Sequence, residues 1–271
     1  NRLHDELLRY PGLLVALSAG VDSGFLLAAA ARSLGSAKVL AVTAVSPSLP
    51  AAERDHARDF AHDLGVPHIE ATTHEMARPG YRENSTSRCY FCKAELLDVI
   101  VPYLAHLPTG ARVATGTNAD DLVAGFRPGI RAAAERGAVT PLADAGMSKA
   151  QIRDAARVWG LTVWDKPQAA CLSSRVAYGI QISPARLARI EAAEIAVRQE
   201  LADRGVPCVN LRVRDLGDEA RIEVDAELAR DPGPWRDAAV AAAVACGFES
   251  AWIDPQGFRS GSMNEGLIPT P

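Results

Sequence analysis

Residues 18–23 form the first segment of the sequence that could do chemistry. They read Ser-Ala-Gly-Val-Asp-Ser and lie between an apolar run and a helical pattern. A glycine lets the backbone approach a ligand, serines offer hydroxyl groups, and a helix start attracts anions. The segment fits neither common phosphate motif, Gly-x-x-x-x-Gly-Lys-Ser/Thr or Gly-x-Gly-x-x-Gly. We expect a pyrophosphate loop of another type, in which Asp22 holds Mg²⁺ or orients an amide; a plain turn capped by Asp22 or Ser23 is the alternative.

The cysteines are the second candidate for chemistry. The 271 residues contain five, an odd number and too few for a disulfide framework, so we expect reduced thiols or metal ligands. Cys89 and Cys92 form a C-x-x-C pair before a helix expected over residues 93–105, and Cys171 lies far downstream. Three thiols are one short of a closed zinc site, but a 4Fe–4S cluster on three thiolates leaves one iron free to carry sulfide. A coincidental pair of half-buried thiols is the alternative for Cys89 and Cys92.

For the other polar residues, the sequence gives weaker evidence of a functional role. Asp120 and Asp121 follow an expected strand and could hold Mg²⁺ or water, or could be a helix N-cap and its neighbour. Basic residues flank the thiols and would lower their pKa values, namely Arg88, Lys93 and Arg175. Two groups of residues are expected to have purely structural roles. Cys208 and Cys246 are expected to pack in the core. A solvated helix face is expected for Glu191, Glu194 and Glu200.

Alternating apolar and helical patterns predict the elements that position these residues. Buried strands are expected at residues 13–17, 39–45, 68–71 and 112–116, with helices at about 22–34 and 50–64. Strands buried on both faces and separated by helices imply a parallel sheet. After residue 178 the pattern changes and indicates a small α+β domain: a helix at 185–204, an antiparallel pair at 208–213 and 220–224, a helix at 235–246 and a strand at 251–253.

Composition and charge exclude several classes of protein. Hydrophobic residues make up 48% and charged residues 23%, which is typical of a folded globular protein. The net charge of −4 gives no general attraction to polyanions, so any anion must be held by a local basic cluster. The most apolar stretch, residues 13–31, is interrupted by Ser18, Asp22 and Ser23, so no membrane span is expected. The first residues are polar and acidic, unlike a secretory leader, and we expect a cytoplasmic protein.

Several longer motifs resemble one known family. Residues 18–23 resemble the S-x-G-x-D-S signature of the PP-loop ATP pyrophosphatases, with Ala19 where that superfamily usually has glycine. If the position requires positive φ, alanine costs about 1 kcal/mol there. Further motifs make the sequence similar to the LarE family of ATP-dependent sulfur transferases, which help to build the nickel-pincer nucleotide cofactor of lactate racemase. These motifs are residues 116–121, 127–129, 164–167, 171–175 and 257–265.

The resemblance implies an α/β fold and a reaction. A parallel-sheet, Rossmann-like PP-loop domain (adenine nucleotide alpha hydrolase-like) would cover residues 1–178, followed by a smaller α+β substrate and oligomerisation domain over 179–271. ATP with Mg²⁺ would adenylate a carboxylate of pyridinium-3,5-biscarboxylic acid mononucleotide, because oxide is a poor leaving group. Sulfur from Cys171, or from a cluster that it ligates, would then attack the acyl-adenylate to give a thiocarboxylate, in two rounds. ATP would be bound by Ser18, Gly20, Asp22, Ser23, Gly116 and Asn118.

Members of this family differ in the source of sulfur. Sacrificial members give up the sulfur of a single cysteine, which becomes dehydroalanine, whereas members with three matching cysteines resemble cluster enzymes. Because this chain keeps Cys89 and Cys92 beside Cys171, we favour a 4Fe–4S cluster on these three thiols. The family also implies a homo-oligomer, a trimer or hexamer.

The anionic mononucleotide would require a local arginine pocket. Arg212 and Arg214 alternate on one face of an expected strand, and Arg259 lies in the last motif. Guanidinium groups suit bidentate contacts with phosphate. Solvated arginines on an edge strand are the alternative for each of them.

Three other functions remain open from the sequence. A tRNA thiolation enzyme also combines a PP-loop with C-x-x-C, although the acidic charge balance and the lack of a basic tract argue against a nucleic-acid partner. An amidating enzyme of the NAD-synthetase kind would share adenylation but would have no use for Cys171. An ATP-sensing module in which Ala19 has abolished catalysis belongs to a different class, and it would release no pyrophosphate.

Overall fold

The computed structural model describes residues 2–123, 125, 127–167, 170–259 and 262. Contacts divide the chain into two compact units: unit 1 comprises residues 1–81 and 87–169, and unit 2 comprises residues 82–86 and 170–271. The boundary expected from the sequence lies at residue 178, whereas the segment around Cys171 belongs to unit 2. Within the described residues, no helix is long and apolar enough to cross a bilayer.

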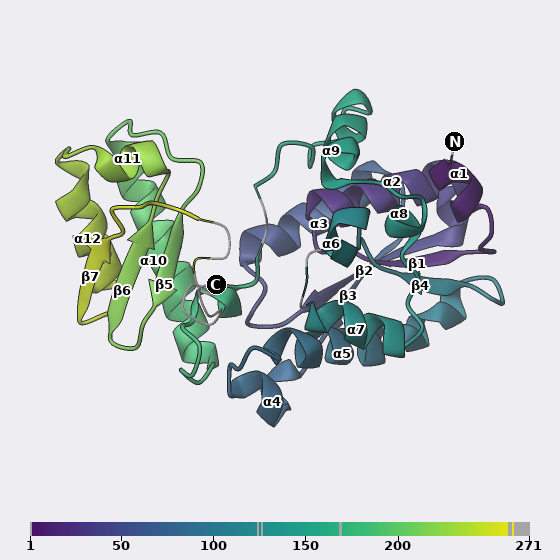
Figure 1. Ribbon diagram of the computed structural model, residues 1–271, viewed down its shortest axis with the longest axis horizontal. Coiled ribbons are helices and arrows are strands. Elements are labelled where there is room, and N and C mark those ends of the chain that lie inside the picture. Colours follow the sequence, from purple (N-terminus) through teal and green to yellow (C-terminus); the bar gives the residue numbers. More distant parts are fainter. Residues whose placement is uncertain (1, 124, 126, 168–169, 260–261, 263–271) are drawn as a thin grey trace. The chain divides into compact units, whose positions relative to one another are not determined.

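Unit 1 is built around a parallel sheet of four strands in the order β3-β2-β1-β4 (Figure 1). Leu14 of the central strand pairs with Leu40 on one side and with Val113 on the other. The expected α/β fold with a parallel sheet is confirmed, because the short apolar runs are the strands that both faces bury. The strands are β1 (Leu13–Ala16), β2 (Val39–Val45), β3 (His68–Thr72) and β4 (Arg112–Ala114).

Helices cover both faces of this sheet. Leu13 and Val15 of β1 belong to one core cluster, and Leu14 and Ala16 belong to the other, as the two-residue period of a strand requires. The first face is covered by α1 (Arg2–Leu7), α2 (Val21–Leu34), α3 (Ala51–Asp63), α8 (Pro141–Asp144) and α9 (Lys149–Val158). The second face is covered by α5 (Arg88–Ile100) and α7 (Pro128–Glu135). Short elements complete the unit: η1 (Ser36–Lys38), η2 (Glu75–Ala77), α4 (Pro79–Arg82), η3 (Val101–His106) and α6 (Ala119–Val123).

The strand order locates the functional edge of the sheet. The chain runs outward from β1 to β2 and β3, then returns to place β4 on the other side of β1. The connections therefore diverge between β1 and β4, and in open α/β sheets ligands bind at the carboxyl ends of the strands flanking such a point. The loops that follow β1 and β4 carry residues 18–23 and 116–121, so the fold brings two of the sequence motifs to one edge.

Unit 2 is the small α+β arrangement that the sequence predicts. The strands β5 (Arg212–Asp215) and β6 (Glu219–Glu223) are antiparallel, and β7 (Ser250–Ile253) pairs parallel with β6. The strand expected from residue 208 begins only at Arg212, and one short helix was not expected. The helical elements are η4 (Leu172–Arg175), α10 (Pro184–Asp203), α11 (Ala226–Arg230) and α12 (Trp235–Ala245).

Candidate functional site

The loop of residues 18–23, called loop 18–23 below, joins β1 to α2. The backbone N–H of Ser18 donates to Ser23 Oγ at 3.1 Å, and the two serine hydroxyls lie 3.0 Å apart. Gly20 is the N-cap of the 14-residue helix α2, and no described side chain caps it. The first amides of α2 are therefore left for a ligand, as expected of an anion site at a helix N-terminus.

Ala19 adopts a positive φ, the conformation in which alanine in place of glycine carries an energetic cost. Its φ is +57°, in the left-handed region, and the residue is fully buried. Such a conformation costs an L-residue about 1 kcal/mol or more, so surrounding contacts must hold it. One such contact is Lys166, whose Nζ donates to the Ala19 carbonyl oxygen at 3.0 Å.

Gly116 brings the end of β4 against the start of α2. A Cβ at this position would lie 2.7 Å from the backbone nitrogen of Ser23, closer than any real side chain allows. The backbones of residues 116 and 23 are therefore neighbours, and only glycine permits this approach. Asn118, two residues further, is buried and accepts from the Asp121 N–H through Oδ1 at 3.1 Å.

Asp22 has one carboxylate oxygen paired and one without a partner. Lys149 forms an ion pair with Oδ2, while Oδ1 is buried without a hydrogen-bond partner among the described residues. An orphaned buried carboxylate oxygen is costly, and a hard cation is the ligand that would satisfy it. Asp22 thus fits the Mg²⁺ role predicted for it, which stays a prediction.

Asp120 and Asp121 each have a backbone partner. Asp120 Oδ2 accepts from the Lys149 N–H at 2.8 Å, and Asp121 Oδ2 accepts from the Asn118 N–H at 3.2 Å. Both aspartates lie inside α6, so neither is the helix N-cap that the sequence left open as the alternative. Asn118 precedes the helix and exchanges two hydrogen bonds with Asp121, as in a capping box. As Mg²⁺ ligands they remain a prediction with less support than Asp22.

The sequence analysis missed two lysines beside loop 18–23. Lys149 is the first residue of α9, a helix whose capping box of Ser148 and Gln151 is readable as S-x-x-Q. Lys166 lies in the motif at residues 164–167, but its role as a partner of Ala19 depends on folding over a long sequence separation. Both lysines reach the loop from the same compact unit.

Cys89 and Cys92 lie inside a helix rather than before one. α5 begins at Arg88 and ends at Ile100, because Pro102 lies in the first turn of the following 3-10 helix η3, which begins at Val101. The two thiols are three residues apart and so share one face of the first turns. Cys89 is exposed and Cys92 is half-buried. Burial lowers the pKa of the adjacent Lys93 ammonium, and the two thiols act on that pKa in the opposite direction.

Residues 170–175, called the cysteine segment below, are fixed through their backbone. The Cys171 carbonyl oxygen accepts from Ser174 Oγ at 2.7 Å and from an Arg175 guanidinium nitrogen at 2.9 Å. Arg175 also donates to the Ala170 carbonyl, and its side chain is only 4% exposed. Its Nε donates to Glu194 Oε1 at 3.0 Å. The Cys171 thiol is half-buried and takes no part in these bonds.

Glu194 corrects the expectation of a solvated helix face on α10. It is half-buried, binds Arg175, and accepts from the Val213 N–H at 3.1 Å. The helix therefore presents this carboxylate to β5 and to the cysteine segment. The helical period shows that a glutamate recurs on a face, but not which element packs against that face.

The three arginines predicted to bind phosphate differ in the partners of their guanidinium groups. Arg214 is buried, binds Glu223 at 2.7 Å, and donates to the Ser174 carbonyl and the Ser262 hydroxyl. Arg259 lies 3.5 Å from Asp254 and donates to a backbone carbonyl. Arg212 is half-buried, and burial, followed by the charge of Arg175, lowers its pKa to about 10. Arg212 donates to the Leu211 carbonyl oxygen at 2.7 Å, and its guanidinium group lies over the Phe258 ring. It still carries a full charge at neutral pH, as an arginine that binds an anion must.

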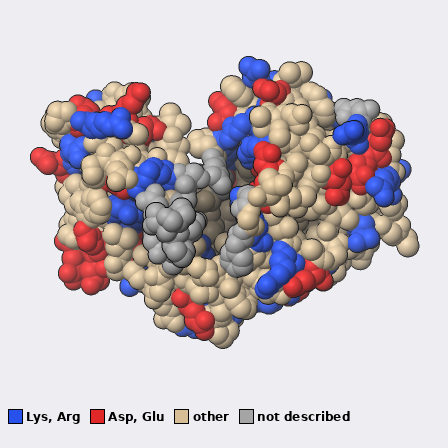
Figure 2. All heavy atoms as spheres, viewed as in Figure 1, with Lys and Arg blue, Asp and Glu red and all other residues tan. Residues whose placement is uncertain are grey.

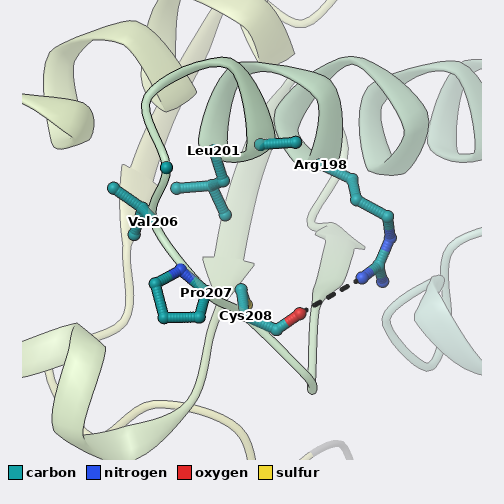
Figure 3. A pocket seen from close by; sticks show the side chains of 7 residues that line it. Arg198, Leu201, Val206, Pro207 and Cys208 are labelled. Atoms are coloured by element: carbon teal, nitrogen blue, oxygen red, sulfur yellow. Dashed lines mark hydrogen bonds between the residues drawn. The ribbon is translucent and has the colours of Figure 1, made fainter.

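The remaining two cysteines lie apart from these features. Cys208 lines a pocket after the end of α10, where an Arg198 guanidinium nitrogen donates to its carbonyl oxygen at 3.4 Å (Figure 3). Its thiol donates to the Asn210 carbonyl, and burial raises its pKa. Cys246 is also half-buried with a pKa raised by burial. Raised pKa values argue against thiolate chemistry at these two residues. Both are half-buried, so the expectation that they pack in the core is wrong.

Comparison with known proteins identifies the family. No family model matches the chain. An uncharacterized protein from Synechocystis sp. is 39% identical over 258 residues, 94% of this chain and 92% of the relative. Pyridinium-3,5-bisthiocarboxylic acid mononucleotide synthase from Lactiplantibacillus plantarum, which is LarE, is 32% identical over 253 residues, 93% of this chain and 89% of the relative. The chain belongs to the LarE family. It is accordingly an enzyme, a sulfur transferase.

The LarE motifs fall on both compact units. Those at residues 18–23, 116–121 and 164–167 belong to unit 1, and that at 171–175 belongs to unit 2. Of the last motif, residues 257–259 and 262 are described, and residues 260–261 and 263–265 lie outside the described residues. The resemblance noted from the sequence is thus confirmed, while the individual site residues stay predictions.

The three thiols predicted to hold a metal cluster are divided between the two compact units. No group of three or more His, Cys, Asp or Glu residues is gathered as metal ligands among the residues that the structure describes. Cys89 and Cys92 belong to unit 1 and Cys171 to unit 2. The pair at the start of α5 fits two cluster ligands in residue type and spacing.

Proposed function

We propose that this enzyme uses ATP to adenylate a carboxylate of pyridinium-3,5-biscarboxylic acid mononucleotide and converts it to a thiocarboxylate. The observation that carries the proposal is the similarity, over nearly the whole chain, to a synthase named for the bisthiocarboxylic acid product. Loop 18–23 and the cysteine segment supply the two halves of the chemistry, activation and sulfur transfer.

Activation is assigned to loop 18–23 and its neighbours. A substrate carboxylate oxygen attacks the α-phosphorus of ATP, the bond from that phosphorus to the bridging oxygen breaks, and pyrophosphate leaves with the electron pair. The uncapped amides of α2 and the hydroxyls of Ser18 and Ser23 stabilise the departing charge. Gly20 gives the ligand access, and Gly116 with Asn118 closes the site from the end of β4. Asp22, whose Oδ1 is buried without a partner among the described residues, would hold Mg²⁺, which would neutralise charge on the phosphates.

Sulfur transfer is assigned to Cys171. A sulfur nucleophile attacks the acyl carbon, the carbon–oxygen bond to AMP breaks, and AMP leaves. If the nucleophile is Cys171 Sγ itself, its Cβ–Sγ bond must then break as the α-proton departs, which leaves dehydroalanine and the thiocarboxylate. A 4Fe–4S cluster on Cys89, Cys92 and Cys171 would instead supply a sulfide and spare the protein. Arg175 holds the backbone of the cysteine segment rigid for either nucleophile.

The substrate phosphate is assigned to three arginines of unit 2, Arg212, Arg214 and Arg259. Arg214 and Arg259 support the pocket while bound to Glu223 and Asp254. The face in Figure 2 shows basic and acidic residues interspersed, in keeping with a small anionic substrate rather than a nucleic acid. We further propose a cytoplasmic homo-oligomer, a trimer or hexamer, whose mass light scattering of the purified protein would measure.

Pyrophosphate release tests the activation step. The purified enzyme should release pyrophosphate from ATP only when the biscarboxylate mononucleotide is present. Asp22→Asn should reduce the rate by at least about 100-fold, because the metal contact and the pair with Lys149 are both weakened. The exposed Asp63 offers a matched control, and Asp63→Asn should leave the rate unchanged. Release without the mononucleotide, or unaffected release in Asp22→Asn, contradicts the proposal.

The mass of the protein after one turnover tests the source of sulfur. Under anaerobic conditions, an unchanged intact mass with iron and sulfide present supports the cluster. Loss of the mass of H₂S from Cys171 supports sacrifice instead. Full activity and no chromophore in a Cys89→Ala/Cys92→Ala variant would eliminate the cluster.

A further inference from the structure

Residues 82–86, called segment 82–86 below, belong to unit 2, although the residues on both sides of them in the chain belong to unit 1. The backbone of this segment is bonded to residues that follow the cysteine segment. The Ile182 N–H donates to the Arg82 carbonyl oxygen at 3.0 Å, and the Gly179 N–H donates to the Asn84 carbonyl oxygen at 3.4 Å. Segment 82–86 therefore lies against the chain that leaves the cysteine segment.

Asn84, in the middle of this segment, combines complete burial with an unusual backbone conformation. Among the described residues, Ala19 and Asn84 are those other than glycine that have a positive φ, which is +53° at Asn84. Asparagine enters the left-handed region more readily than most residues do. Asn84 is also fully buried, and a buried amide group needs hydrogen-bond partners.

The Asn84 side chain finds these partners on three backbone carbonyl groups. Its Nδ2 donates to the carbonyl oxygens of Ala177 at 2.8 Å, Ile180 at 3.0 Å and Val176 at 3.2 Å. An amide nitrogen carries only two hydrogens, so the three acceptors share them. Carbonyl oxygens can only accept, so this place in the fold requires a donor. An aspartate here would turn a carboxylate toward three other acceptors.

These bonds fix the end of the helix that Cys171 begins. Cys171 is the N-cap of η4, and Val176, one of the three partners of Asn84, is its C-cap. The Val176 N–H donates to the Ser173 carbonyl oxygen at 3.3 Å, so Val176 is bonded both to η4 and to Asn84. Arg175 holds the other end of η4 through the Cys171 carbonyl at 2.9 Å. All of these contacts lie within unit 2.

We propose that Asn84 is a positioning residue for Cys171, which fixes the end of η4 so that the Cys171 sulfur is held where transfer requires it. The inference rests on the proposed function, because it takes sulfur transfer to occur at Cys171. Asn84 touches no reacting atom and acts through the carbonyl groups that it binds. The bonds described for Asn84 share no partner with loop 18–23, so its loss should affect sulfur transfer and leave activation unchanged.

Hydrogen–deuterium exchange of the full chain tests the hold of Asn84 on η4. Asn84→Gly removes the amide and keeps a residue that adopts a positive φ without strain. It should exchange at least about five-fold faster than the unaltered enzyme in peptides covering residues 170–177, and at an unchanged rate in peptides from α10. Glu83→Gly, at the exposed neighbouring position, is the matched control and should leave both rates unchanged.

The two products of a single turnover test the positioning role itself. Misplacement of about 1 Å at a reacting group can cost about 100-fold in rate. We expect Asn84→Gly to form thiocarboxylate at least about 10-fold more slowly, while pyrophosphate release stays within about two-fold of the unaltered enzyme. A residue that only stabilises the fold would lower both rates together. Glu83→Gly should keep both rates.

Unchanged exchange at residues 170–177, unchanged thiocarboxylate formation, or an equal loss of both products in Asn84→Gly would overturn the positioning role. If Asn84→Gly does not fold, Asn84→Ser keeps one donor and should show the same selective effects in weaker form; their absence there overturns it as well. An unaltered enzyme that forms no thiocarboxylate would instead contradict the proposed function, and the exchange rates would still report whether Asn84 fixes η4.

Discussion

Loop 18–23 in unit 1 and the cysteine segment in unit 2 use charge in opposite ways. The loop keeps polar groups without partners: the amides at the start of α2 lack a described side-chain cap, and Asp22 Oδ1 is buried and unpaired among the described residues. In the cysteine segment, Arg175 donates to two carbonyls and is neutralised by Glu194. The Cys171 thiol takes no part in these bonds.

This difference separates a binding site from a rigid support. A loop that binds a polyphosphate and a cation must leave donors and one carboxylate oxygen available, and it accepts strain at Ala19 to do so. A segment that presents a sulfur nucleophile needs a fixed backbone, which a buried ion pair supplies. Arg175 and Arg214 both already form ion pairs, with Glu194 and Glu223.

Arg175→Met should have the largest effect on stability. It leaves the half-buried Glu194 without its cationic partner, which costs about 3–5 kcal/mol in the free energy of unfolding. Urea unfolding measures the loss, and Arg175→Met/Glu194→Gln should recover part of it. The affinity for an ATP analogue should change by less than about two-fold, because the bonds described for Arg175 are made to Ala170, Cys171, Ser174 and Glu194 and share no partner with loop 18–23. A large loss of nucleotide affinity would break the comparison.

Gly116→Ala should disturb the backbone of loop 18–23 and lower the rate of pyrophosphate release. The new methyl group would meet the Ser23 backbone nitrogen at 2.7 Å, so one of the two segments must shift. Misplacement of about 1 Å at a reacting group can cost about 100-fold in rate, and we expect a loss of pyrophosphate release of that order. Gly129→Ala on α7, where a Cβ meets nothing closer than 3.5 Å, is the control and should stay active. Equal activity of the two variants would contradict the close approach of β4 and α2.

Arg212→Met should sharpen the distinction among the arginines. Loss of a charge-assisted contact with phosphate should raise the KM for the mononucleotide by about 10-fold or more, with the KM for ATP unchanged. Arg214→Met should lower the free energy of unfolding as well, because Glu223 is fully buried. The exposed Arg198 provides a control, Arg198→Met. An equal rise of both KM values in Arg212→Met would remove it from the substrate pocket.

Ala19→Gly should have the smallest effect. Glycine relieves the left-handed conformation but adds flexibility to the unfolded chain, so the two contributions of about 1 kcal/mol oppose each other. We expect the free energy of unfolding to change by less than about 1 kcal/mol. Ala30→Gly, at a fully buried position within α2, has no strain to relieve and should lose about 1 kcal/mol or more. A larger loss in Ala19→Gly than in Ala30→Gly would show that Ala19 is not strained.

The sequence predicted the framework because its signals are local. Apolar runs such as residues 39–45 became buried strands, and the motif at 18–23 lies between a strand and a helix as expected. The strand order then followed only from the structure, yet it is what brings Gly116 to Ser23. The positive φ of Ala19 could not be predicted from the sequence, because the backbone conformation of a residue depends on the contacts that surround it in the fold.

Contacts across long sequence separations could not be predicted. Lys166 binds Ala19, and Lys149 binds Asp22, although more than a hundred residues separate the partners. Glu194 was taken for a solvated residue because a helical pattern does not reveal which strand lies against it. The start of α5 at Arg88 was missed because Cys89 and Cys92 were considered as ligands rather than as residues of a first helical turn.

The most direct test of the account is Cys171→Ser assayed for both half-reactions. We predict that this variant still releases pyrophosphate when ATP and the mononucleotide are supplied, because loop 18–23 is unchanged, and that no thiocarboxylate forms. Mass spectrometry of the mononucleotide and a pyrophosphate assay on the same sample measure the two products. Thiocarboxylate from Cys171→Ser, or loss of pyrophosphate release together with it, would contradict the division of activation and sulfur transfer between the two segments.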